Sequence, residues 1–234
     1  MINGKRILAL IPARGGSKGI KNKNIIDLCG KPLISYTIAA AKESRYIDSV
    51  IVSTDSEKIA EVAVSCGASV PFLRPIALAL DTSTTVEAVC HTIRTLAECG
   101  DRYDVLVLLQ PTSPLRTLED IDGALEKFER EGLPIASVSK AKDSPILLRK
   151  LKGESQMESL LGLPCTVRRQ DMPPVYRVNG SIYINTISSL SMNTSFNDNV
   201  FPYVMDESHS VDIDDYLDLE IAKYYIEKRH EIHE

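Results

Sequence analysis

The sequence predicts an α/β fold, with a mostly parallel open sheet and helices on both faces in a Rossmann-like arrangement. Two observations support this. Short apolar runs alternate with amphipathic helical stretches over the first ~140 residues, as in successive βαβ units. The composition, 44% hydrophobic and 25% charged over 234 residues, is that of a globular chain long enough to bury a core. We therefore expect a single domain spanning residues 1–234.

The predicted elements follow one another regularly. Apolar runs bounded by proline, glycine or polar residues predict strands at 6–12, 50–54, 69–73, 104–109, 135–138 and 180–185. Helical spacing predicts helices at 33–43, 55–66, 84–100, 117–130 and 215–229. Asp55, Thr84 and Thr117 are the expected N-caps, and Glu87 completes a capping box with Thr84.

Residues 140–178 interrupt this alternation with a mixture of proline, arginine and other polar side chains. Structureless stretches of that length are uncommon within a compact domain unless they have a function. We expect either a long excursion or a small dimerisation flap inserted into the domain.

The charge distribution argues against nucleic-acid binding and in favour of a small anionic ligand. The net charge is −5, whereas broad nucleic-acid binding requires a basic surface. Residues 14–23 nevertheless contain four cations and no carboxylate, while residues 206–218 contain six carboxylates and no lysine or arginine. An acidic protein that keeps one basic loop is expected to use that loop on a small anion.

Cysteine usage and hydropathy indicate the compartment. Five cysteines without a CxxC pair favour a reduced, cytosolic chain over a disulfide framework or a zinc site. The N-terminus lacks the cleavage region of a signal peptide, and no apolar segment reaches the ~18 residues that a membrane span requires. We expect a cytoplasmic protein with no membrane partner.

The basic loop directly follows the first predicted strand, where open α/β sheets bind their ligands. Its glycines allow the backbone to approach a phosphate, and its cations can neutralise a polyphosphate. Neither GxxxxGK[ST] nor GxGxxG is present, so the loop matches neither common nucleotide-binding motif. A solvated surface turn is the alternative, but four cations directly after the strand favour a phosphate site.

Asp212 and Asp214 form a DxD pair ahead of the last predicted helix. In an extended segment, side chains two residues apart face the same way, so both carboxylates can bind one Mg²⁺ together with nucleotide phosphates. The alternative is that Asp214 or Asp215 caps the helix. The residues alone do not separate these two interpretations.

Other polar groups also allow two interpretations. Gln110 emerges after the 104–109 strand and Arg116 could meet an anion, but a βα turn bracketed by prolines needs no ligand. Hydroxyls within 81–85 can cap a helix or meet an anion at its N-terminus. Donors in or beside the irregular segment suit a carboxylate and a hydroxylated sugar, or form weak surface ion pairs; they are Arg168, Arg169, Arg177 and Asn179.

Seven motifs, in order and at matching spacing over almost the whole chain, resemble those of the CMP-sialic acid synthetases (acylneuraminate cytidylyltransferases). They are IPARGGSKGIKNKNI at 11–25, GKPLISYTI at 30–38, VIVSTD at 50–55, FLRP at 72–75, LLQPTSPLR at 108–116, RVNGSIYIN at 177–185 and VDIDDYLDLEIA at 211–222. The resemblance implies a nucleotidyltransferase fold, and a homodimer in which the 140–178 flap reaches into the partner's site. The implied reaction joins CTP to an acidic nine-carbon sugar, giving the CMP-sugar and pyrophosphate with the help of Mg²⁺ or Mn²⁺.

The resemblance also assigns residues. Nucleotide contacts fall on Ala13, Arg14, Gly15, Ser17, Lys18, Asn24, Arg74 and Thr85. Catalytic positions fall on Lys23, Asp212 and Asp214, and the two carboxylates are also the metal pair. Substrate contacts fall on Gln110, Arg169, Arg177 and Asn179, with Arg169 acting on the partner's sugar. Arg177 and Asn179 lie on the sugar side or brace the site.

One departure leaves the sugar open. Familiar sialic-acid members place a lysine just after the proline of the 145–148 stretch, where this chain has its first cations at Arg149 and Lys150. Sialic acid and bacterial relatives such as legionaminic acid both remain candidates. Two rival functions also stay open: a nucleotidyltransferase for another sugar acid, such as 3-deoxy-manno-octulosonate, and a non-catalytic CTP-sensing domain.

Overall fold

The computed structural model describes residues 2–17, 19–162, 166, 168 and 172–233, without the side chains of 230–233. Its centre is a six-stranded sheet with the order β10-β6-β9-β5-β1-β4. Five strands share one direction and β9 opposes both of its neighbours, which confirms the predicted mostly parallel sheet. The strands are β1 (Ile7–Pro12), β4 (Ser49–Ser53), β5 (Val105–Leu109), β6 (Ile135–Lys140), β9 (Tyr176–Thr186) and β10 (Phe201–Val204).

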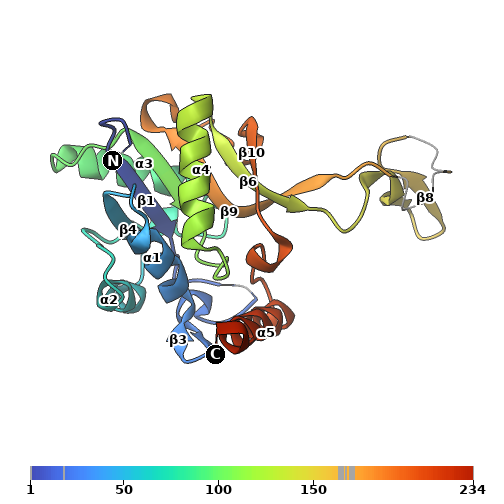
Figure 1. Cartoon of the computed structure of the whole chain (residues 1–234), viewed down its shortest axis with the longest axis horizontal. Helices are drawn as coiled ribbons and strands as arrows, with labels where there is room; N and C mark the ends of the chain where they lie inside the picture. The colour runs from blue at the N-terminus through green and yellow to red at the C-terminus, as the bar shows by residue number, and fades with distance from the viewer. Residues whose placement is uncertain (1, 18, 163–165, 167, 169–171, 234) are drawn as a thin grey trace.

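Helices cover both faces of this sheet, as predicted (Figure 1). Alternate residues of β1 enter opposite apolar clusters: Ile7 packs on the side of α1, α2 and α4, and Leu8 on the side of α3. The α-helices of the described residues are α1 (Leu33–Glu43), α2 (Glu57–Ser65), α3 (Thr85–Glu98), α4 (Leu118–Glu131) and α5 (Tyr216–His233). Short 3₁₀ helices lie in the connections, at Lys23–Ile25, Ile76–Leu78, Pro145–Leu147, Ile187–Ser189, Phe196–Asp198 and Glu207–His209.

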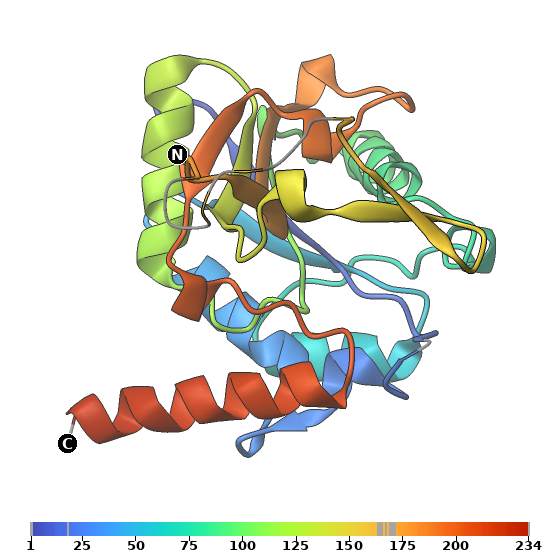
Figure 2. The same ribbon diagram turned by 90° about the vertical axis from the view of Figure 1, so that its right-hand side faces the viewer.

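The C-terminal helix α5 packs outside the main sheet. It runs beside the small hairpin of β2 (Asp27–Leu28) and β3 (Lys31–Pro32), as Figure 2 shows. Ile213, just ahead of α5, is fully buried in the apolar cluster that the helix shares with this hairpin. That anchor fixes the DxD segment against the end of the sheet.

Local capping signals were mostly predictive. The capping boxes of Thr84 with Glu87 and of Thr117 with Asp120 are both present. The expected cap at Asp55 is wrong, because Ser56 caps α2 and the Asp55 carboxylate instead accepts a hydrogen bond from another loop. The predicted 69–73 strand is also wrong. Only a single bridge joins Ser69 to β4, since Pro71 has no N–H to continue the ladder.

Part of the 140–178 segment is more regular than predicted. Strand β9 begins at Tyr176 and pairs there with Lys140, so β6 and β9 leave the body together as a stalk. The stalk carries an antiparallel hairpin of β7 (Arg149–Lys152) and β8 (Gln156–Ser159), far from the sheet in Figure 1. We call this extension the arm. Its role as a dimerisation flap stays a prediction.

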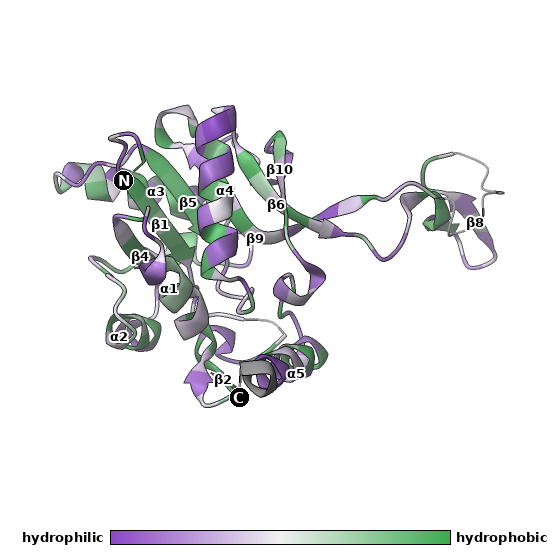
Figure 3. Ribbon diagram, viewed as in Figure 1, coloured by the Kyte–Doolittle hydropathy of each residue, from purple (hydrophilic) through white to green (hydrophobic). Residues whose placement is uncertain are grey.

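Figure 3 shows the apolar strands at the centre and a more mixed surface on the helices. Within the described part of the chain, no helix is both long and apolar enough to cross a membrane.

Candidate active site

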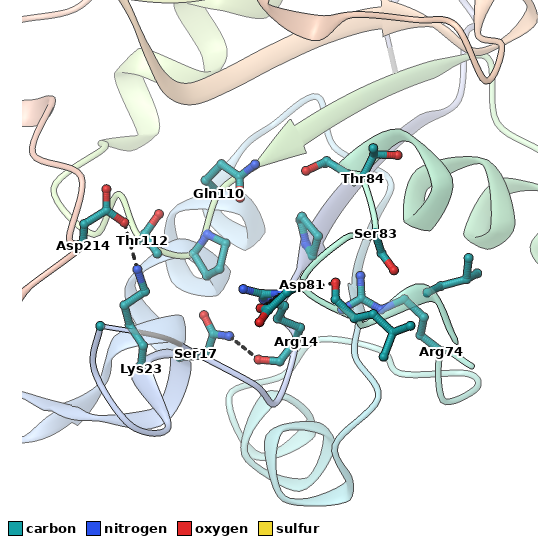
Figure 4. Close-up of a pocket in the computed structure, with 17 residues that line it drawn as sticks. Arg14, Ser17, Lys23, Arg74, Asp81, Ser83, Thr84, Gln110, Thr112 and Asp214 are labelled. Carbon is teal, nitrogen blue, oxygen red and sulfur yellow. Dashed lines mark hydrogen bonds and ion pairs between the residues drawn. The ribbon is translucent and has the colours of Figure 1, made fainter. Parts of the chain in front are cut away.

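A polar cleft of about 520 Å³ lies beyond the carboxyl ends of β1 and β5, the usual ligand position in an open α/β sheet. Figure 4 shows its walls converging from separate parts of the chain. Its polar lining comprises Arg14, Ser17, Lys23 and Asn24 of the basic loop, Arg74, the segment of Asp81, Ser83, Thr84 and Thr85, then Gln110 and Thr112, and finally Asp214.

The predicted nucleotide residues divide into two groups. Arg14, Ser17, Asn24, Arg74 and Thr85 line the cleft. Two others lie beneath it, because the Ala13 N–H donates to the Ser53 carbonyl at 2.9 Å and the Gly15 N–H donates to Asp55 Oδ1 at 2.9 Å. Those two amides therefore shape the loop and are not available to a phosphate. Lys18 lies outside the described residues.

Arg14 reaches across the cleft. Its Nη1 lies 2.8 Å from Asp81 Oδ1 and donates to the Leu80 carbonyl at 3.3 Å. The buried Asn24 amide donates to the Arg14 carbonyl at 2.9 Å, which fixes the backbone from below. The basic loop and the segment before α3 are thus joined above the cleft floor (Figure 4).

Arg74 has unused hydrogen-bonding capacity at the cleft wall. Its side chain is only 5% exposed, and neither Nε nor Nη2 has a hydrogen-bond partner among the described residues. Burial lowers the pKa of Arg74, while the Asp55 carboxylate, 3.8 Å from Nη2, acts in the opposite direction. A buried donor without a partner is costly, so these groups indicate a ligand that supplies acceptors.

Lys23 joins the basic loop to the acidic segment. Its Nζ donates to the Ile213 carbonyl at 2.7 Å and to Asp214 Oδ1 at 3.1 Å (Figure 4). Gly19 makes the same junction tight, because a Cβ there would lie 2.4 Å from the Asp214 carbonyl oxygen. The predicted catalytic lysine and one predicted carboxylate are therefore in direct contact.

Capping does not account for the DxD pair. Asp215 caps α5, with its Oδ1 accepting from Leu217 N at 2.8 Å and Asp218 N at 3.0 Å. The Asp212 and Asp214 side chains both line a second hollow, of about 660 Å³, and Asp214 also lines the cleft. Of the two residues expected as possible caps, Asp215 is thus the one that caps the helix, which leaves the Asp212 and Asp214 carboxylates for another role.

The Asp212 carboxyl is electrostatically unusual. Desolvation by the surrounding protein raises its pKa, and the nearby Asp214 charge adds to this, while the Thr112 hydroxyl and Lys23 act in the opposite direction. Within the described residues, no group of three or more His, Cys, Asp or Glu side chains could hold a metal ion. Two carboxylates completed by phosphate oxygens and water are, however, a donor set that suits Mg²⁺.

Gln110 lies where the cleft meets a third hollow, of about 550 Å³. Thr84 and Thr85 also line both cavities, and the far wall consists of Tyr183 and the 192–197 segment. Sequence reasoning missed that segment, because a run of Ser, Asn and Thr after a strand is typical of any surface loop. Its nearness to Gln110 arises only from the fold.

The remaining predicted substrate residues have different surroundings. Arg177 is exposed on the stalk and lines the hollow of Asp212 and Asp214. Asn179 is buried, accepts from Ser137 Oγ at 2.5 Å and donates to Ser210 Oγ at 3.2 Å, which is the bracing alternative of its two predicted roles. Arg169 lies outside the described residues.

Arg116 does not face an anion, so that suggestion from the sequence is wrong. The residue is 3% exposed, and its guanidinium donates to the Ser181 carbonyl and to Thr37 Oγ1, both at 2.7 Å. The guanidinium therefore lies in the protein interior, beneath Gln110. No feature of the sequence separates it from the arginines that reach the cleft.

Comparisons with known proteins agree with this geometry. The chain is 38% identical over 231 residues to the CMP-N,N'-diacetyllegionaminic acid synthase of Legionella pneumophila, covering 97% of this chain and 98% of that protein. It is 36% identical over 220 residues to the N-acylneuraminate cytidylyltransferase of Escherichia coli, covering 93% of this chain and 51% of that protein. A solved CMP:2-keto-3-deoxy-manno-octonic acid synthetase, complexed with CTP, has the same fold, with a TM-score of 0.72 at 14% identity over 96% of this chain and 99% of that one.

A family model described as cytidylyltransferase matches residues 8–228, from β1 into the last helix. That range includes every wall of the cleft and the arm. The chain therefore belongs to the cytidylyltransferase family.

Proposed function

We propose that the protein is a CMP-nonulosonic acid synthetase. It transfers the CMP group of CTP to the anomeric hydroxyl of an acidic nine-carbon sugar and releases pyrophosphate. The observation that carries this proposal is the meeting of two cavities at Gln110, beside the Lys23–Asp214 contact, because two anionic substrates need adjoining sites with fixed cations between them. Of the relatives covered over nearly their full length, the CMP-N,N'-diacetyllegionaminic acid synthase is 38% identical and a pseudaminic acid cytidylyltransferase 34% identical, which favours the diacetylated legionaminic acid.

The nucleotide half of the reaction belongs to the first cleft. Arg14 and Lys23 face it with two cations for the triphosphate, and Arg74 offers donors without protein partners for the acceptors of the nucleotide. Ser17 and Thr85 add hydroxyls at opposite walls. We assign CTP to this cleft, with its α-phosphate toward Lys23 and Asp214.

The sugar half belongs to the hollow beyond Gln110. Its wall mixes the aromatic faces of Tyr183 and Phe196 with the amide and hydroxyl groups of Asn193, Thr194 and Asn197. Such a wall suits the amide substituents of an acylated sugar acid, which carry both a methyl group and hydrogen-bonding atoms. Arg177 is assigned to the sugar side from the neighbouring hollow.

The chemistry is an attack by the anomeric oxygen on the α-phosphate. A bond forms between that oxygen and phosphorus, the bond to the bridging α–β oxygen breaks, and pyrophosphate leaves. Lys23 stabilises the negative charge that builds up on the phosphate oxygens, and the hydroxyl proton passes to one of the two carboxylates. Asp212 and Asp214 would hold a Mg²⁺ ion, which would supply further charge neutralisation.

We further propose a homodimer in which the arm contacts the partner subunit. The arm exposes large apolar side chains, with Leu151 82% and Met157 70% exposed, which is typical of a surface that is covered in an assembly. Activity per chain is expected to fall when dilution dissociates the dimer. Full activity of a monomer, followed by light scattering, would contradict this part of the proposal.

Pyrophosphate release with CTP and a panel of sugars tests the function. We expect turnover with a diacetylated legionaminic acid or N-acetylneuraminic acid, less with 3-deoxy-manno-octulosonate, and none with a sugar 1-phosphate and UTP. Asp214→Ala is expected to bind CTP but to lose turnover. Binding of CTP without turnover in the unaltered protein would favour the CTP-sensing alternative.

A further inference from the structure

Arg116 is a buried cation without a carboxylate partner. It is 3% exposed, and none of the described Asp or Glu side chains forms an ion pair with it. Burial lowers its pKa to about 9, with the charge of Asp120 acting in the opposite direction. A buried charge costs more than an apolar side chain of similar size, so filling space does not explain an arginine here.

The guanidinium connects three elements. Nη1 donates to the Ser181 carbonyl of β9 at 2.7 Å and to Ser181 Oγ at 3.1 Å. Nη2 donates to Thr37 Oγ1 of α1 at 2.7 Å. Both nitrogens also lie within 3.4 Å of the Gln110 carbonyl, at the start of the loop that Arg116 ends. The loop of residues 110–116 is therefore clamped at both ends by one side chain.

That loop carries two functional contacts. Gln110 lies at the junction of the nucleotide cleft and the adjoining hollow. Thr112 accepts from the Ile213 N–H at 2.8 Å through its carbonyl and so holds the backbone directly after Asp212, while its hydroxyl acts to lower the pKa of the Asp212 carboxyl. A shift of the loop would therefore move both the predicted sugar contact and one predicted metal ligand.

We propose that Arg116 is a positioning residue, which fixes the 110–116 loop so that Gln110 meets the sugar and Thr112 holds Asp212. This inference rests on the proposed function for its catalytic consequence. Arg14 and Arg74, two of the three cations that line the nucleotide cleft, make no hydrogen bond to this loop within the described structure, so metal-free CTP binding is expected to depend on Arg116 much less than turnover does.

The test is Arg116→Met in the full chain. The kcat is expected to fall about 100-fold, the effect of misplacing groups by roughly 1 Å, and the KM for the sugar acid to rise. The Kd for CTP without metal is expected to stay within about threefold, while the gain in CTP affinity on adding Mg²⁺ shrinks because Asp212 is no longer held. A folded variant with nearly unchanged kcat and unchanged Mg²⁺ dependence would overturn the inference, as would an equal loss of metal-free CTP binding.

Thr37→Val provides a second test if Arg116→Met does not fold. It removes one 2.7 Å acceptor at nearly constant volume, and Thr37→Ser keeps the hydroxyl as the matched control. We expect a smaller fall in kcat and in Mg²⁺ dependence for valine, and recovery with serine. Equal behaviour of the two variants would overturn the inference. If the unaltered protein binds CTP but shows no turnover, the proposed function fails, and the Mg²⁺ dependence still decides the role of Arg116.

Discussion

Arg74 and Arg116 are both buried arginines beside the same site, yet their donors are used differently. Arg74 leaves Nε and Nη2 without a hydrogen-bond partner in the described structure, at a wall of the cleft. Arg116 commits both terminal nitrogens to Ser181, Thr37 and the Gln110 carbonyl, and leaves only its Nε without a partner in the described structure. Because an unsatisfied buried donor is expensive, the unpaired Nη2 of Arg74 at the cleft wall predicts a ligand, whereas the bonded terminal nitrogens of Arg116 indicate a scaffold.

The two arginines also differ in whether a carboxylate lies close to them. Asp55 lies 3.8 Å from Arg74 and also accepts the Gly15 N–H, so one carboxylate holds both the buried arginine and the basic loop. Arg116 has no such partner among the described residues and depends on neutral acceptors. The proposed nucleotide end of the site is therefore built from paired charges, and the loop beneath the proposed sugar site depends on a single charge held by neutral acceptors.

The largest effect is expected for Arg74→Met. The substitution removes two donors of a charged group that the nucleotide would otherwise satisfy. CTP binding is expected to weaken about 100-fold, since each such hydrogen bond contributes about 1.5–3 kcal/mol. Calorimetric titration with CTP measures the effect. Arg116→Met is the matched control, with the reverse outcome: intact metal-free CTP binding and impaired turnover. Equal loss of CTP affinity in both variants would remove the distinction between ligand and scaffold arginines.

The close contact between Gly19 of the basic loop and Asp214 of the DxD segment can also be tested. In Gly19→Ala the new Cβ would lie 2.4 Å from the Asp214 carbonyl oxygen, so the basic loop or the DxD segment must move. A fall in kcat of about 10- to 100-fold is expected from the misplaced groups. Gly16→Ala is the matched control, because no heavy atom lies within 4 Å of a Cβ there. Similar rates for the two variants would show that this close contact does not limit turnover.

Local signals made most of the fold predictable. Apolar runs marked β1, β5 and β6, and the capping residues Thr84 and Thr117 marked helix starts within a residue. Strand β10 was missed, since its four residues include a proline and gain their place only by pairing with β6. The reversed direction of β9 was missed for a similar reason, because pairing direction depends on a long connection and not on local sequence.

The site was predictable where its residues occur together in sequence. The basic loop and the DxD pair are compact motifs, and the structure brings Lys23 and Asp214 to within 3.1 Å. The roles of Asp55 and Arg116 were not predictable, since a carboxylate after a strand suggests a helix cap and an arginine in a loop suggests an anion site. Their actual partners lie 40 and 65 residues away along the chain.

A smaller effect is expected for Asp55→Asn. The variant keeps an acceptor for the Gly15 N–H but loses the charge beside Arg74, so CTP affinity is expected to fall about tenfold through a loosened arginine and loop. Ser56→Ala, which removes the cap of α2, serves as the control: its thermal stability falls while its CTP affinity is kept. Unchanged CTP binding in Asp55→Asn would show that Arg74 needs no counter-charge, as Arg116 needs none.

The smallest effect concerns Asp212, an exposed residue whose carboxyl pKa is nevertheless raised by partial desolvation, in contrast to the fully buried Arg116. Because desolvation raises its pKa above the ordinary 3.8, the folded state holds this proton more tightly than the unfolded state does. The resulting loss of folding stability is absent below the pKa of the unfolded state. It grows as the pH rises toward the raised pKa of the folded state and is complete above that value. Asp212→Asn is therefore expected to raise Tm by a few degrees at most near neutral pH, with the difference vanishing in acid, while turnover is lost. Asp214→Asn, which breaks the contact with Lys23, is expected to show no such gain. Thermal melts of the three proteins across pH measure this, and a pH-independent difference would mean that Asp212 is well solvated.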